Sequence, residues 1–84
     1  LFIQWMAFDP ARNRLAVNWR LAPTCCESEI VLLDCGDMTR IPYDLKFPQG
    51  AVQDVRLSFD TTTNTLVVTR PGNVNRMQFY SLPD

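Results

Sequence analysis

The sequence predicts an all-β chain made of two consecutive antiparallel β-meanders. Three observations predict it: a pattern that occurs twice, short aliphatic runs of strand length between turn residues, and the lack of a helical apolar stripe. The pattern F-D-x-x-x-N-x-L-x-V covers residues 8–17 and, at an offset of 51, residues 59–68. Because self-similarity at a fixed spacing indicates a repeated structural unit, we expect both copies to form the same hairpin.

The first copy divides into four short strands separated by turns. The strands are expected at residues 5–8, 15–17, 30–33 and 39–45. An aspartate and an asparagine frame the first turn, where Asx side chains bond nearby backbone amides and asparagine tolerates the left-handed region. Pro42 cannot donate to a β-ladder, which favours an edge position for the fourth strand.

The second copy repeats the first three strands, which are expected at residues 55–59, 66–68 and 77–80. Residues 30–34 align with residues 77–81 at an offset of 47, so the loop before the third strand is expected to be shorter in the second copy. The fourth strand of the second copy is expected to be missing. We therefore divide the chain into a first unit over residues 1–50 and a truncated second unit over residues 51–84.

A period of about 40 to 50 residues with four strands per unit is typical of β-propellers. Residues 52–60, VQDVRLSFD, resemble the first strand of a divergent WD40-like blade, with its V-x-x-V-x-F-S-x-D style. Residues 30–34, IVLLD, resemble the third strand, with Leu33 and Asp34 where the family often has Trp-Asp. The resemblance implies consecutive four-stranded antiparallel β-meander blades of a β-propeller, about two blades with the second incomplete.

The chain departs from the WD40 pattern in ways that leave other folds open. It has no histidine, so the hydrogen-bonded tetrad of typical WD40 blades cannot form, and it lacks the Gly-Gly pair of kelch blades and the Asp-box of sialidase blades. The sequence still allows a lactonase-like or other type of propeller, and it also allows a small self-contained β-sandwich or barrel. Propellers typically need four to eight blades, so the resemblance implies completion by another polypeptide or by copies of the chain.

Composition argues against several kinds of chemistry. Without histidine, Ser-His-Asp and Cys-His arrangements are excluded within the chain. Cys25, Cys26 and Cys35 lack the C-x-x-C spacing of structural zinc sites and are expected to be unpaired thiols. Asp9 and Asp60 are equivalent in the repeat and are expected to be turn residues. We therefore expect no enzyme activity, no catalytic residues, no metal and no cofactor.

Net charge and hydropathy argue against two classes of binding partner, nucleic acids and membranes. A net charge of -1 offers no basic face for nucleic acid and no polybasic segment for a membrane. No apolar run reaches the length of a membrane-spanning helix. Three cysteines and no Asn-x-Ser/Thr acceptor favour an intracellular location, cytoplasmic or nuclear.

Arginine accounts for seven of the eight basic residues, and arginine binds carboxylates bidentately and is enriched in interface hot spots. In WD40-like blades the loop after the second strand lies on the face most used for partners, so the resemblance implies partner-binding residues there. The candidates are Trp19, Arg20, Arg70, Asn73 and Asn75. The alternative is that Trp19 packs between blades and the arginines are solvated.

The function that these observations favour is a protein–protein interaction scaffold, part of a WD40-like β-propeller in an intracellular assembly. Its partners would be other protein chains, either the remaining blades or subunits of a complex, with self-assembly possible. Two alternatives stay open. One is a fragment of a β-propeller enzyme whose catalytic residues lie on other blades. The other is a small β-sandwich that binds a ligand through exposed aromatic residues such as Trp5 and Trp19.

Overall fold

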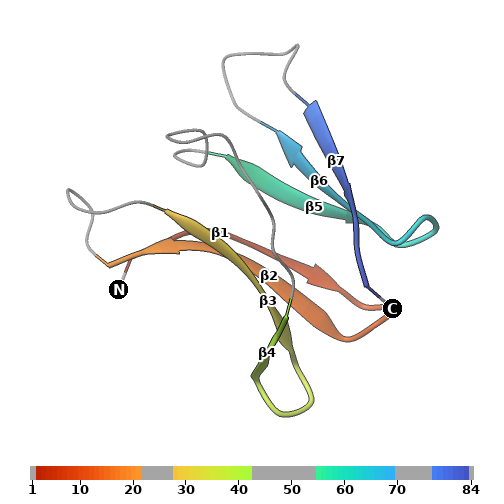
Figure 1. Ribbon diagram of the computed structural model, residues 1–84, viewed down its shortest axis with the longest axis horizontal. Helices are drawn as coiled ribbons and strands as arrows, with labels where there is room; N and C mark the ends of the chain where they lie inside the picture. The colour runs from red at the N-terminus through yellow and green to blue at the C-terminus, as the bar shows by residue number, and fades with distance from the viewer. Residues whose placement is uncertain (1, 22–27, 43–54, 70–76, 84) are drawn as a thin grey trace.

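The computed structural model describes residues 2–21, 28–42, 55–69 and 77–83, and this part of the chain consists of strands, turns and no helix (Figure 1). Accordingly, none of the described residues forms a helix that could cross a membrane. Within these residues all strand pairs are antiparallel, and they form one sheet of four strands and one of three. The all-β prediction is confirmed.

Each sheet is a meander in which every strand pairs with its neighbour in the sequence. The first sheet contains β1 (Phe2–Asp9), β2 (Arg14–Arg20), β3 (Glu29–Asp34) and β4 (Thr39–Ile41). The second contains β5 (Arg56–Asp60), β6 (Thr65–Thr69) and β7 (Met77–Ser81). The expected fourth strand is therefore shorter than residues 39–45, because β4 ends at Ile41 and residues 43–45 lie outside the described residues.

The first hairpin of each sheet has the same geometry, as the repeated pattern predicts. Asp9 pairs with Arg14 across the first turn, and Asp60 pairs with Thr65 across the second. The last turn residue before the second strand has a positive φ in both hairpins, 51° at Asn13 and 53° at Asn64. Asparagine is among the few residues besides glycine that adopt this left-handed conformation readily, which explains why the pattern keeps it.

The third strands also match at the offset of 47 that the alignment predicts. Leu15 pairs with Leu33 in the first sheet, and the aligned Leu66 pairs with Tyr80 in the second. Each sheet also has an equivalent backbone hydrogen bond just beyond the end of its third strand. The amide of Cys35 donates to the carbonyl of Asn13 at 3.0 Å, as the aligned amide of residue 82 does to residue 64.

The two sheets present unlike faces to each other. One side of the first sheet carries Ala16, Ile30 and Leu32, and the same side of the second sheet carries the aligned residues Val67, Met77 and Phe79. We call this side the front face of each sheet. The back face carries Met6, Phe8 and Leu15 in the first sheet, which align with Leu57, Phe59 and Leu66 in the second. The core joins the front face of the first sheet to the back face of the second, so the repeated units pack head to tail.

This core holds the sheets together mainly through aliphatic side chains. Its buried members are Ala16, Ile30, Leu32, Val55, Leu57, Leu66, Val68 and Leu82. Burying one such leucine or isoleucine contributes about 1.5–3 kcal/mol relative to an exposed position. The strands closest to each other across the interface are β1 and β5, the first strand of each sheet, which lie side by side in Figure 1.

A buried ion pair of the first sheet lies at the end where the first hairpins turn, and its arginine also contacts the second sheet. Asp9 is fully buried and Arg14 is 5% exposed, and Arg14 Nη2 donates to Asp9 Oδ2 at 2.8 Å. The same guanidinium donates across the interface to Asn64 Oδ1 at 2.6 Å and to the carbonyl oxygen of Pro83 at 2.8 Å. Its Cζ also lies 5.8 Å from the centroid of the Phe59 ring. We call this arrangement the arginine clamp.

Asp9 is also the turn residue that the sequence predicts. Its Oδ1 accepts hydrogen bonds from the backbone amides of Ala11 at 3.0 Å and Arg12 at 3.3 Å, and the aligned Asp60 accepts one from its own turn at 3.2 Å. Burial raises the pKa of the Asp9 carboxyl, but the hydrogen bond and charge of Arg14 and the two amides outweigh burial and lower the pKa below its ordinary value. The ion pair is therefore a structural element of the turn.

Candidate binding cleft

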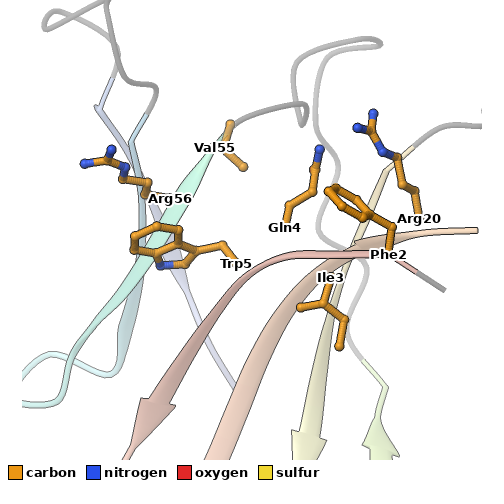
Figure 2. A pocket seen from close by; sticks show the side chains of 7 residues that line it. All are labelled: Phe2, Ile3, Gln4, Trp5, Arg20, Val55 and Arg56. Atoms are coloured by element: carbon orange, nitrogen blue, oxygen red, sulfur yellow. The ribbon is translucent and has the colours of Figure 1, made fainter. Parts of the chain in front are cut away.

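A cleft of about 390 Å³ opens at the other end of the strands, where β1 and β5 begin and β2 ends (Figure 2). Its lining residues are Phe2, Ile3, Gln4, Trp5, Arg20, Val55 and Arg56. They come from both sheets, so the head-to-tail packing that builds the core also builds the cleft.

A β-bulge in β1 shapes one wall of the cleft. The register of β1 against β2 shifts between Ile3 and Trp5, which makes Gln4 the extra residue. Side chains normally alternate between the two faces of a strand, and a bulge interrupts this alternation and re-aims a side chain. In Figure 2 Phe2 and Gln4 point to the cleft side while Ile3 points away, and Trp5 follows Gln4 on the cleft side.

Two arginines stack on aromatic rings at the cleft. Arg20 Cζ lies 5.1 Å from the centroid of the Phe2 ring, and Arg56 Cζ lies 5.3 Å from the Trp5 ring. A cation–π contact of this kind contributes about 0.5–1 kcal/mol at an exposed site and restrains the guanidinium. The indole is fixed in turn, because Trp5 Nε1 donates to the carbonyl oxygen of Leu57 in the neighbouring sheet at 3.1 Å.

The described residues that line the cleft include two arginines and no acidic side chain to balance them. None of the seven lining residues is an aspartate or a glutamate. Arg20 Nε is buried and has no hydrogen-bond partner among the described residues. Gln4 Oε1 accepts from Ser28 Oγ at 3.1 Å, which orients the amide. Guanidinium groups recognise carboxylates through paired hydrogen bonds, so the cleft is suited to an anionic group next to an apolar one.

The structure places two of the five predicted partner-binding residues, and it separates them. Arg20 lines the cleft, whereas Trp19 points to the opposite face of β2, where it pairs with Ile3 and Glu29 and is half-buried. Neighbouring strand residues face opposite sides of a sheet, so the two could not act on the same ligand from one strand. Arg70, Asn73 and Asn75 lie outside the described residues.

Five cleft residues were not singled out as binding residues from the sequence: Phe2, Ile3, Gln4, Val55 and Arg56. The signal that could have found Arg56 is its alignment with Trp5 at the offset of 51, because it puts an arginine and a tryptophan on adjacent first strands. Phe2 and Gln4 gave no such signal, since their placement depends on the bulge and nothing in the local sequence marks it.

Two further predictions from the sequence concern metals and thiols. Within the described residues, no group of three or more His, Cys, Asp or Glu side chains is close enough to hold a metal ion. Cys35 directly follows β3 as a free, half-buried thiol, and Cys25 and Cys26 lie outside the described residues.

Comparison with models of known protein families, with curated proteins and with solved structures finds no significant match.

Proposed function

We propose that this chain is a protein–protein interaction scaffold whose two sheets are consecutive blades of a WD40-like β-propeller in an intracellular assembly, and whose cleft binds an acidic peptide segment. The head-to-tail packing of two meanders supports the propeller reading, because each sheet uses its front face against the back face of the next. A two-layer sandwich of equivalent sheets with a two-fold relation would instead bring like faces together.

The observation that carries the binding proposal is that two arginines line one cleft whose described lining has no acidic residue. Arg20 and Arg56 come from different sheets, and each is held against an aromatic ring. Held side chains lose less conformational entropy when they bind, so a preorganised pair of arginines gains more from each carboxylate contact than two free ones.

The size and lining of the cleft favour a peptide side chain over a larger ligand. A volume of about 390 Å³ accepts a few side chains, and the rings of Phe2 and Trp5 offer apolar surface next to the charges. A segment with Asp or Glu at one position and Leu or Phe two positions further on matches both features, because an extended peptide presents alternate residues to one surface.

Fluorescence polarisation with a labelled library of short peptides tests the proposal. In these peptides Asp or Glu is followed two positions later by Leu or Phe, and the matched set carries Asn and Gln at the acidic positions. We expect the acidic peptides to bind and the neutral set to bind at least about tenfold more weakly, because a hydrogen bond to a charged group contributes about 1.5–3 kcal/mol. Equal affinity for both sets would refute the proposed recognition.

Arginine variants locate the binding on the molecule. Arg20→Gln and Arg56→Gln should each reduce affinity for the acidic peptides by about tenfold or more. Arg12→Gln is the matched control, because it removes the same charge from the β1–β2 turn, where Arg12 Nη1 donates to the carbonyl oxygen of Thr61 at 3.1 Å. If the control reduces affinity as much as the cleft variants do, binding reflects net charge and the cleft is not the site.

A further inference from the structure

Among the described residues, exposed apolar side chains lie on two outer sheet faces. On the back face of the first sheet, Met6 and Phe8 are each 54% exposed, and on the front face of the second sheet Met77 is 53% and Phe79 is 64% exposed. Side chains of this size and number on a sheet face are unusual for a soluble monomer, and contiguous apolar patches mark interaction sites.

Each uncovered face is the repeat equivalent of a face that is buried between the sheets. Met6 aligns with Leu57, which is 4% exposed, and Phe8 aligns with Phe59, which packs against the core. The third-strand residues Met77 and Phe79 align in the same way with Ile30 and Leu32, which are both buried. The chain therefore carries both halves of its own sheet-to-sheet interface a second time, on its two outer surfaces.

We propose that two copies of this chain associate. The front face of the second sheet in one copy packs onto the back face of the first sheet in the other copy. The contact would repeat, between molecules, the head-to-tail packing that already joins the two sheets within one molecule. The contact is heterologous, which means that each molecule uses two different faces to bind its two neighbours. Repetition of such a contact closes a ring or extends a fibre. Because each copy supplies two sheets, a closed ring with the usual number of propeller blades would contain about two to four copies.

The residues at the two outer faces suit this contact. The front face of the second sheet has Val67, Met77 and Phe79 where the buried front face of the first sheet has Ala16, Ile30 and Leu32, so these three aligned positions are apolar in both sheets. A different protein could also cover one face, but only a second copy covers both by a contact whose geometry the molecule already contains.

One element of the internal interface is absent from the proposed one. Thr65 occupies the position of Arg14, so a second copy brings no arginine to Phe8 and Asn13, which are the equivalents of the clamp partners Phe59 and Asn64. The contact between copies should therefore be weaker than the contact within the chain. It also provides a gain-of-function test, because Thr65→Arg would restore an acid–arginine pair with Asp60.

Size-exclusion chromatography with light scattering on the whole chain tests the contact. The wild type should form assemblies whose mass is a multiple of 9.7 kDa. Met6→Glu and Phe79→Glu should each be monomeric, and circular dichroism should show that both keep the β-sheet signal, since both side chains are exposed. Mixed together, the two variants should form a 1:1 dimer and nothing larger, because one complete pair of faces remains.

The outcomes that overturn the proposal are equally definite. A wild type that stays monomeric at high concentration would overturn it, and so would variants that assemble alone or do not combine when mixed. If the wild type forms large particles, each single substitution must dissolve them, because an open head-to-tail contact propagates through both faces. Particles that resist both substitutions would show non-specific aggregation.

The second test strengthens the contact. Thr65→Arg should lower the concentration at which the assembly dissociates by about tenfold or more, because buried acid–arginine pairs at interfaces are often hot spots. Thr62→Arg is the matched control, since it adds the same charge to the exposed turn of the same hairpin. No difference between the two variants would contradict the equivalence of the faces. Peptide binding by the cleft does not enter either test, so the two proposals fail separately.

Discussion

Arg14 and Asn64 connect the two sheets through one short hydrogen bond, in which Arg14 Nη2 donates to Asn64 Oδ1 at 2.6 Å. The two residues belong to the equivalent hairpins of successive units, so the turn of one unit receives the side chain of the other. Asn64 reaches this position because its backbone is left-handed, and its Nδ2 also donates to the carbonyl oxygen of Leu82 at 3.0 Å. Turn geometry and sheet docking are therefore coupled at this residue.

Removal of the arginine should be strongly destabilising. Arg14→Met leaves Asp9 buried without its counter-charge, and we expect the free energy of unfolding to fall by about 3–5 kcal/mol. The double variant Asp9→Asn/Arg14→Met removes both charges and should be more stable than Arg14→Met alone. Urea denaturation of the four forms gives the coupling energy, and additive effects would show that the pair is not coupled.

Asparagine variants separate backbone strain from the contact with the clamp. Asn13→Ala and Asn64→Ala both place alanine at positive φ, without the polar side chain that lets asparagine adopt this conformation. Each substitution should lower the free energy of unfolding by about 1–2 kcal/mol. Asn64→Ala also removes the acceptor of Arg14, so it should cost about 1–3 kcal/mol more than Asn13→Ala. Thermal unfolding of the two variants measures the difference. Equal losses would assign the whole effect to the turn.

Acid should weaken the fold through Asp9. Its pKa is lowered in the folded state, so near an ordinary carboxyl pKa of about 3.9 the unfolded chain binds more protons, and stability rises with pH. The contribution is fully present above about pH 5 and is lost as the pH falls through the lowered pKa. Urea midpoints measured from pH 7 down to acid should fall less for Asp9→Asn than for the wild type. Parallel curves would exclude Asp9 as the cause.

Core truncation should distinguish the two faces of the second sheet. Leu66→Ala opens a cavity in the buried core and should cost about 2–5 kcal/mol. Phe79→Ala removes a larger side chain from the exposed face and should change the stability of the monomer by about 0.5 kcal/mol or less. Urea denaturation in dilute solution, where the chain is expected to be monomeric, measures the loss of stability in both variants. A larger loss for Phe79→Ala would mean that the front face is covered within one molecule.

The hairpins could be predicted from the sequence because their determinants are local. The aspartate, the left-handed asparagine and the aliphatic runs lie within ten residues of one another, and both the register and the offsets of 51 and 47 follow from them. The third strands could be aligned for the same reason, since each pairs with the strand just before it.

The clamp and the cleft could not be predicted because they form between segments far apart in the sequence. Arg14 and Pro83 are separated by 69 residues, and Trp5 and Leu57 by 52. Arg14 was not singled out from the sequence, and only the docking of the second sheet gives its guanidinium the acceptors on Asn64 and Pro83. Of the two predicted binding residues that the structure describes, Arg20 reaches the cleft and Trp19 does not, because strand alternation sends Trp19 to the other face.

The neighbour-to-neighbour order of the strands has a kinetic consequence. Every ladder in either sheet closes through a short connection, which is the fast class of folding event, whereas docking of the sheets must bring residue 14 to residues 64 and 83. Hairpin substitutions such as Asn13→Ala should therefore slow refolding, and clamp substitutions such as Arg14→Met should mainly accelerate unfolding. Stopped-flow chevron plots of these two variants would show on which limb each effect falls, and thus that the chain builds its sheets before it joins them.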